Sequence, residues 1–195
     1  MHGLVNRAIQ RFVADSYGEE KWRATMKGAG LDFIEFEAMW DYDQDVTEKV
    51  LASTCKVLER GREDVLEDIG TYLVSHPNVS AVRRLLRFGG LNFVEFLHSL
   101  DDLPDRARLA VSELYLPRVE VIERDPTCYV LRCYGDCCGW GHVFVGVLRA
   151  MADDYGYLAF LEHKGRENGV ETVEIVLLET GYAVGRSFDL GAGYA

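Results

Sequence analysis

The sequence of 195 residues has little positive charge and no long apolar run. A membrane-spanning helix needs roughly 18 consecutive apolar residues, and no run approaches that length. The opening residues, Met1-His2-Gly3, are not followed by the apolar segment of a secretory signal. The 21 Lys and Arg are outnumbered by 32 Asp and Glu, and the net charge of −11 argues against binding to nucleic acid or to anionic membranes. We therefore expect a cytosolic protein that binds neither nucleic acid nor a membrane.

Motifs of the common enzyme classes are also missing. The sequence contains no nucleophile elbow, no phosphate-binding loop, no dinucleotide fingerprint and no His-Glu-x-x-His zinc motif. The glycines around Trp140 lack the strand–turn–helix context of a phosphate site. We expect a protein that is not an enzyme and has no catalytic residues.

Helical periodicity dominates the first ~115 residues. With 48% hydrophobic residues, the chain can bury a sizeable core. Pro104 is expected to interrupt the helical pattern, with Asp102 capping a restart at Asp105. The spacing of apolar residues predicts helices over 4–18, 20–27, 45–59, 62–73, a stretch after His76-Pro77, 92–100 and 105–111.

After Leu116-Pro117 the apolar period changes from helical to alternating. Two hairpins are predicted, 119–133 and 157–178, separated by a helix over 140–154. The fold class is therefore α+β, with a four-stranded antiparallel sheet. We expect one domain over 1–180, composed of a helical subdomain (1–60) and an α+β subdomain (61–180), followed by a tail (181–195).

Four of the five cysteines lie between Cys128 and Cys138. Thiolates together with an imidazole are ligands that zinc prefers, so Cys133, Cys137, Cys138 and His142 form a candidate metal or redox site. An adjacent cysteine pair at a helix N-terminus also favours a lowered thiol pKa. The alternative is that these are reduced thiols that behave as small hydrophobic residues.

Three stretches resemble one known family. The opening Met1-His2-Gly3-Leu4-Val5-Asn6-Arg7, the segment Leu86-Arg87-Phe88-Gly89-Gly90 with Phe93 to Leu103, and Leu116-Pro117 are similar to haem–nitric oxide/oxygen-binding (H-NOX, HNOB) domains, relatives of the haem domain of soluble guanylate cyclase. The resemblance covers residues 1–180. It implies a helical subdomain and an α+β subdomain that hold a cofactor between them.

The resemblance also implies a cofactor pocket. We expect it to be lined by Leu4, Val5, Leu86, Leu97, Leu100, Leu103, Pro104, Pro117, Cys133, Gly135, Cys137 and Val143. The family's haem-ligating histidine corresponds to Pro104, which has no ligating atom. Its Tyr-x-Ser-x-Arg motif, which holds the haem propionates, becomes Cys133-x-Gly135-x-Cys137. Val143, or His142 after a one-residue shift, occupies the gas-binding side, where an apolar residue favours nitric oxide over oxygen.

These features predict an H-NOX-like sensor or ligand-binding module whose haem binding is degenerate or altered. The resemblance implies that it signals through a separate protein, such as a histidine kinase or a cyclic-di-nucleotide enzyme. A haem-free thiol or zinc redox switch on the same fold is the alternative, and a structural interaction domain is a third hypothesis. The cofactor is thus haem, zinc or none.

Overall fold

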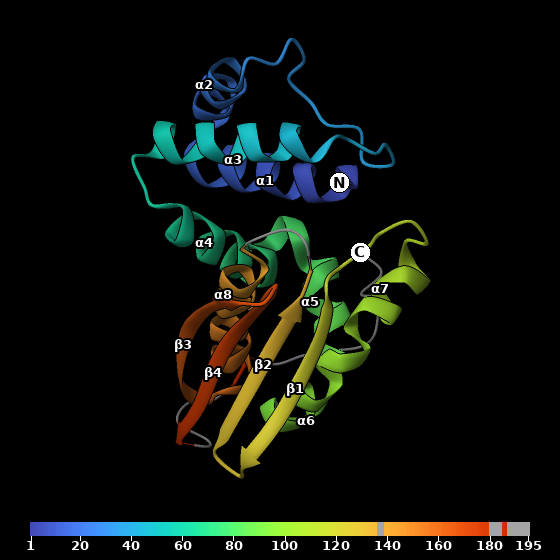
Figure 1. Cartoon of the computed structure of the whole chain (residues 1–195), viewed down its shortest axis with the longest axis vertical. Coiled ribbons are helices and arrows are strands. Elements are labelled where there is room, and N and C mark those ends of the chain that lie inside the picture. Colours follow the sequence, from blue (N-terminus) through green and yellow to red (C-terminus); the bar gives the residue numbers. More distant parts are fainter. Residues whose placement is uncertain (136–138, 180–184, 187–195) are drawn as a thin grey trace.

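The computed structural model describes residues 1–135, 139–179, 185 and 186. It consists of helices and one four-stranded antiparallel sheet, and this confirms the α+β fold class. Figure 1 shows α1, α2 and α3 as a helical layer at one end, with α4, α8 and the sheet below it. The helices are α1 (Gly3–Tyr17), α2 (Glu19–Ala29), α3 (Gln44–Leu58), α4 (Arg62–Ser75), η1 (Pro77–Val79), α5 (Ser80–Arg87), α6 (Phe93–His98), η2 (Ser99–Asp102), α7 (Leu103–Ala110) and α8 (Trp140–Tyr155).

The sheet has the order β1-β2-β4-β3 and is built from two hairpins. Each hairpin pairs neighbours in the sequence, and β2 joins β4 at the centre, with Cys133 opposite Glu171. Asn168 and Gly169 both have positive φ and form the turn of the second hairpin, within the predicted range 157–178. The strands are β1 (Arg118–Asp125), β2 (Cys128–Tyr134), β3 (Leu158–Glu167) and β4 (Val170–Glu179).

The region around Pro104 differs from the expectation. The chain continues from α6 through the 3₁₀-helix η2 directly into α7, which starts at Leu103. Pro104 lies in the first turn of α7, where its missing N–H removes no intrahelical hydrogen bond. Asp102 occupies the position before the helix, but its side chain makes no capping hydrogen bond.

Two apolar cores divide the molecule. One contains residues of α1 to α4, and the other contains residues of α5 to α8 and the sheet. Helix α4 belongs to both, because Val65, Leu66 and Ile69 join the first core and Val74 joins the second. The expected subdomain boundary at residue 60 therefore precedes a helix that the two cores share.

Helices α4 and α8 approach each other at two glycines. A Cβ on Gly70 would lie 2.0 Å from the Val143 carbonyl oxygen, and a Cβ on Gly146 would lie 1.9 Å from the Glu67 carbonyl oxygen. Neither backbone oxygen can move without moving its helix, so both positions require glycine for packing.

Among the helices of the described residues, none combines the length and the apolar character needed to cross a membrane.

Replacing Gly146 by Ala is expected to force α4 and α8 apart. Overpacking of this kind costs about 2 kcal/mol or more of unfolding free energy. Urea denaturation followed by circular dichroism measures the loss. Gly135→Ala is the control, because its Cβ would meet only Pro117, at 3.5 Å. Equal stability of the two variants would show that the helices can separate without cost.

Candidate functional site

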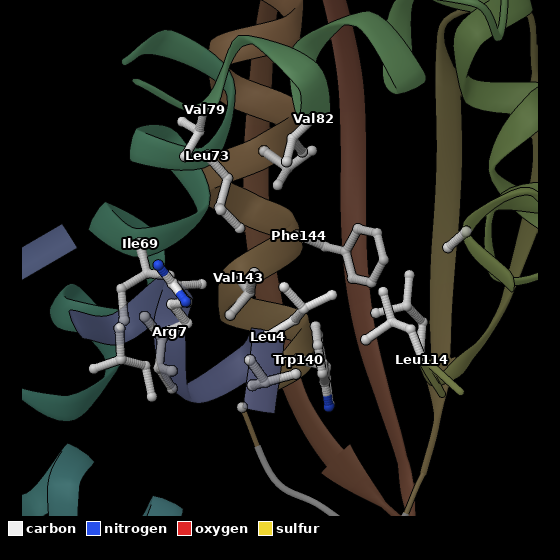
Figure 2. A pocket seen from close by; sticks show the side chains of 18 of the residues that line it. Leu4, Arg7, Ile69, Leu73, Val79, Val82, Leu114, Trp140, Val143 and Phe144 are labelled. Carbon is white, nitrogen blue, oxygen red and sulfur yellow. The ribbon is translucent and has the colours of Figure 1, made fainter. Parts of the chain in front are cut away.

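A cavity of about 420 Å³ lies where the helical layer meets α4, α5, α7 and α8. Figure 2 shows apolar side chains converging on it from several of these helices. Its lining residues are Met1, Leu4, Val5, Arg7, Ala8, Ile9, Arg11, Thr47, Glu48, Leu51, Leu66, Ile69, Leu73, Val79, Val82, Leu85, Leu86, Leu103, Ala107, Leu114, Leu116, Gly139, Trp140, Val143, Phe144 and Val147.

Helical periodicity explains which side chains reach the cavity. On α8 the lining residues are Trp140, Val143, Phe144 and Val147, which share one helix face. On α1 the same spacing includes Leu4, Arg7, Ala8 and Arg11, and Val5 and Ile9 also line the cavity. Helix α8 thus presents one stripe to the cavity, whereas α1 presents a broader and partly cationic face.

Helix α5 contributes Val82, Leu85 and Leu86 to the cavity lining, and an ion pair with the buried Asp154 ties this helix to α8. The guanidinium of Arg83 donates to both carboxylate oxygens of Asp154, at 2.7 to 3.1 Å. Asp154 is only 2% exposed, and a bidentate pair of this kind fixes orientation as well as distance. Arg87 lies over the ring of Tyr155, 3.9 Å from its centroid. Both contacts keep the Leu85 and Leu86 side chains at the cavity.

The N-terminus of α8 carries a polar cluster beside the cavity. The buried Glu171 carboxylate accepts hydrogen bonds from the backbone N–H groups of Gly139 and Gly141, both at 2.6 Å. The rings of His142 and His163 stack with centroids 3.9 Å apart. His142 Nδ1 lies 3.3 Å from Glu67 Oε1. His163 Nε2 is buried 3.5 Å from Glu171 Oε2, and it makes no hydrogen bond among the described residues. Glu171 therefore caps α8 from the neighbouring sheet, at the helix end that favours negative charge.

Five of the residues expected in the pocket line the cavity: Leu4, Val5, Leu86, Leu103 and Val143. Six others are placed elsewhere. Leu97, Leu100 and Cys133 are almost fully buried in the second core. Pro104 and Pro117 are half-buried and Gly135 is exposed, and none of these three is among the lining residues. Cys137 lies outside the described residues.

The candidate metal site is only partly described. Cys137 and Cys138 lie outside the described residues, so only Cys133 and His142 are placed. Across residues 1–135 and 139–179, with 185 and 186, no group of three or more His, Cys, Asp or Glu side chains is arranged to hold a metal ion. His142 contacts His163 and Glu67.

The chain matches a known protein family over most of its length. The haem-NO-binding family, HNOB, matches residues 2–163. The chain belongs to this family. It is a family of sensor domains related to soluble guanylate cyclase.

Two curated relatives of this HNOB chain are cyclases. It is 31% identical to the rat guanylate cyclase soluble subunit beta-2 over 93 residues, which are 48% of this chain and 14% of that protein. It is 21% identical over 154 residues to the soluble guanylate cyclase gcy-31 of Caenorhabditis elegans, covering 79% of this chain and 22% of that one. The chain therefore spans less than a quarter of these relatives.

Solved H-NOX structures share the fold. A mutant H-NOX of T. Tengcongensis superposes with a TM-score of 0.74 at 15% identity, covering 92% of this chain and 99% of that chain. An oxygen-binding H-NOX domain related to soluble guanylate cyclases, in its oxygen complex, gives a TM-score of 0.68 at 15% identity, with 96% and 100% covered. At these identities the comparison establishes the fold alone.

Among the described residues, the lining of the cavity holds few of the usual ligands of haem iron. Haem is held by histidine, cysteine, tyrosine or methionine side chains. The described lining residues include no histidine, cysteine or tyrosine, and Met1 is their sole thioether. A haem held by an axial histidine and a Tyr-x-Ser-x-Arg motif therefore does not fit these residues.

No sequence motif identifies three residues that lie at or beside the cavity, namely Arg7, His163 and Glu171. Arg7 lies within the segment that carries the family resemblance, and only its helical spacing from Leu4 and Ala8 marks it as facing the cavity. His163 and Glu171 lie on neighbouring strands, β3 and β4. Their proximity to Gly139 and His142 comes from the packing of α8 against the sheet, for which the sequence has no local signal.

Cys133 is expected to be unreactive in the folded protein. Burial raises the pKa of its thiol, and the negative charge of Glu171 raises it further. Because the thiolate is the nucleophile, we expect iodoacetamide at about pH 8 to alkylate Cys133 at least about tenfold more slowly in the native than in the unfolded protein. Peptide mass mapping measures the rates. Rapid native labelling would show that this thiol is exposed and available for redox chemistry.

Proposed function

We propose that this chain is a non-catalytic, cytosolic sensor module of the HNOB family that has kept the ligand cavity and lost haem binding of the family's kind. One observation carries the proposal: the cavity is lined mainly by hydrocarbon, and the residues that correspond to the family's haem-holding positions lack the required groups. Pro104 has no ligating atom, and Cys133 and Gly135 cannot replace a phenol and a hydroxyl as propionate anchors.

The position of the cavity supports a sensing role. It touches α1 and α3 of the first core and α5, α7 and α8 of the second, with the shared helix α4 between them. A ligand in the cavity contacts both cores at once, so its binding free energy can favour one relative arrangement of the cores over another. A change of that kind alters the outer surface that a partner contacts. We propose a separate signalling protein as the partner, such as a histidine kinase or a cyclic-di-nucleotide enzyme.

The thiol or zinc switch gains no support from the described residues. Cys133 is 3% exposed and its pKa is raised, whereas a thiolate ligand or nucleophile requires a lowered pKa. His142 is already engaged with His163 and Glu67.

The absence of family-type haem binding is tested by absorbance. We expect protein purified from haem-supplemented cells to show no Soret band. The variant Pro104→His restores the imidazole at the family's ligand position and is expected to raise the haem content above that of wild type. Pro104→Ala is the matched control, because it also removes the ring but adds no ligand. The pyridine haemochrome assay measures haem per chain.

A Soret band with one haem per chain in the wild type would contradict the proposal. In that case another side chain holds the iron, and Met1 is the first to replace because it is the thioether among the described lining residues. Equal haem content in the two Pro104 variants would show that this position does not face the iron.

A further inference from the structure

Arg7 is a charged side chain at an apolar cavity. It lies on α1, one turn from Leu4 and one turn from Arg11, and it is half-buried. Figure 2 shows its guanidinium among the hydrocarbon side chains that line the cavity, with Ile69 and Val143 among its labelled neighbours. Within the part of the chain that the structure describes, the Arg7 guanidinium takes part in no hydrogen bond or ion pair. This arrangement leaves the donors of a partly desolvated cation available.

Three other polar side chains at the cavity are already engaged or solvated. Glu48 pairs with Arg62, with oxygen and nitrogen 2.8 Å apart. The Thr47 hydroxyl donates to the Asn6 side chain at 2.7 Å. Arg11 is exposed, so water solvates its charge. Arg7 is therefore the charged group with the most to gain from a ligand.

A carboxylate is the group that satisfies Arg7 best. The guanidinium presents paired N–H donors that match the two oxygens of a carboxylate, and such a bond is stronger where water is partly excluded. An alcohol accepts fewer hydrogen bonds, and an ammonium group is repelled. The head group that fits this end of the cavity is thus a single carboxylate.

The remainder of the cavity selects a hydrocarbon tail. Leu66, Ile69, Leu73 and Val147 offer no hydrogen bonds, so a sugar or a nucleotide base placed against them would lose its hydrogen bonds to water without replacement. A volume of about 420 Å³ lies within the ordinary range for small-molecule sites. Hydrocarbon transferred from water to such walls is stabilised in proportion to its buried area.

We propose that this cavity binds an amphipathic monocarboxylate, an acid of the fatty-acid class, with its carboxylate on the Arg7 guanidinium and its alkyl chain against the apolar side chains that α4 and α8 present to the cavity. The inference rests on the proposed function, because it assumes that haem does not fill the cavity. The net charge of −11 repels anions from the protein as a whole, so a preference for an anionic ligand has to come from Arg7 locally.

The first experiment is calorimetric titration of the full chain with dodecanoate, dodecanol and dodecylammonium, all below their aggregation concentrations. Dodecanoate is expected to bind with a stoichiometry of one and at least about tenfold more tightly than the other two, because a hydrogen bond to a charged group contributes more than one to a neutral group. Each methylene removed from the acid is expected to weaken binding about fourfold. Equal affinity for the acid and the ammonium would overturn the proposal.

The second experiment replaces the cation. Arg7→Gln is expected to weaken dodecanoate binding at least about tenfold and to leave dodecanol binding nearly unchanged, because only the charged contact is lost. Arg7→Lys retains the charge and should keep the preference for acid over alcohol. Arg23→Gln, on the exposed surface of α2 and away from the cavity, is the matched control and should bind as wild type. Unchanged acid binding by folded Arg7→Gln would overturn the proposal.

Failure of this inference is distinguishable from failure of the proposed function. A stoichiometric Soret band in the wild type defeats the proposed function, whatever the titrations show. A haem-free protein that binds dodecanoate no better than dodecanol defeats this inference alone. If Arg7→Gln does not fold, the three-ligand comparison on the wild type and the Arg7→Lys variant still decide the outcome.

Discussion

The close contact between α4 and α8 is the constraint on which the rest of the structure depends. Gly70 and Gly146 let two helix backbones touch, and no larger residue fits at either place. Because α4 belongs to both cores, this contact fixes the helical layer relative to the sheet. It also fixes the positions of Val143 and Val147 of α8 relative to Ile69 and Leu73 of α4, and all four residues line the cavity. A change in this contact therefore alters the fold and the cavity together.

Under the proposed function, this chain keeps the cavity of the family and loses its cofactor chemistry. The apolar wall needs only residues of suitable size at helical spacing, so many sequences preserve it. Holding haem needs particular atoms at particular points, and Pro104, Cys133 and Gly135 do not supply them. A cavity without those atoms still has a large free energy to gain from an apolar ligand. The Arg7 guanidinium adds a preference for one head group, which hydrocarbon walls cannot provide.

Much of the candidate site was predictable where it follows one helix. The period that places Leu4 and Val143 on apolar faces is visible in the sequence, and both line the cavity. Leu97 and Leu100 have the same apolar character, but α6 and η2 turn them into the second core, and nothing local distinguishes a core position from a cavity wall. The expected interruption appears as the 3₁₀-helix η2, but α7 starts at Leu103 and not at Asp105, because a proline in the first turn of a helix removes no hydrogen bond.

The sequence by itself determined the α+β fold class and the two hairpins. Those properties are local, since periodicity, turn residues and motif positions are read within short windows. Only the tertiary structure decided that α4 serves both cores, that Glu171 caps α8 from across the sheet, and that Arg7 reaches the cavity without an acceptor among the described residues. These three features depend on the packing of segments that are distant in the sequence. No short stretch of sequence indicates which distant segments will be in contact.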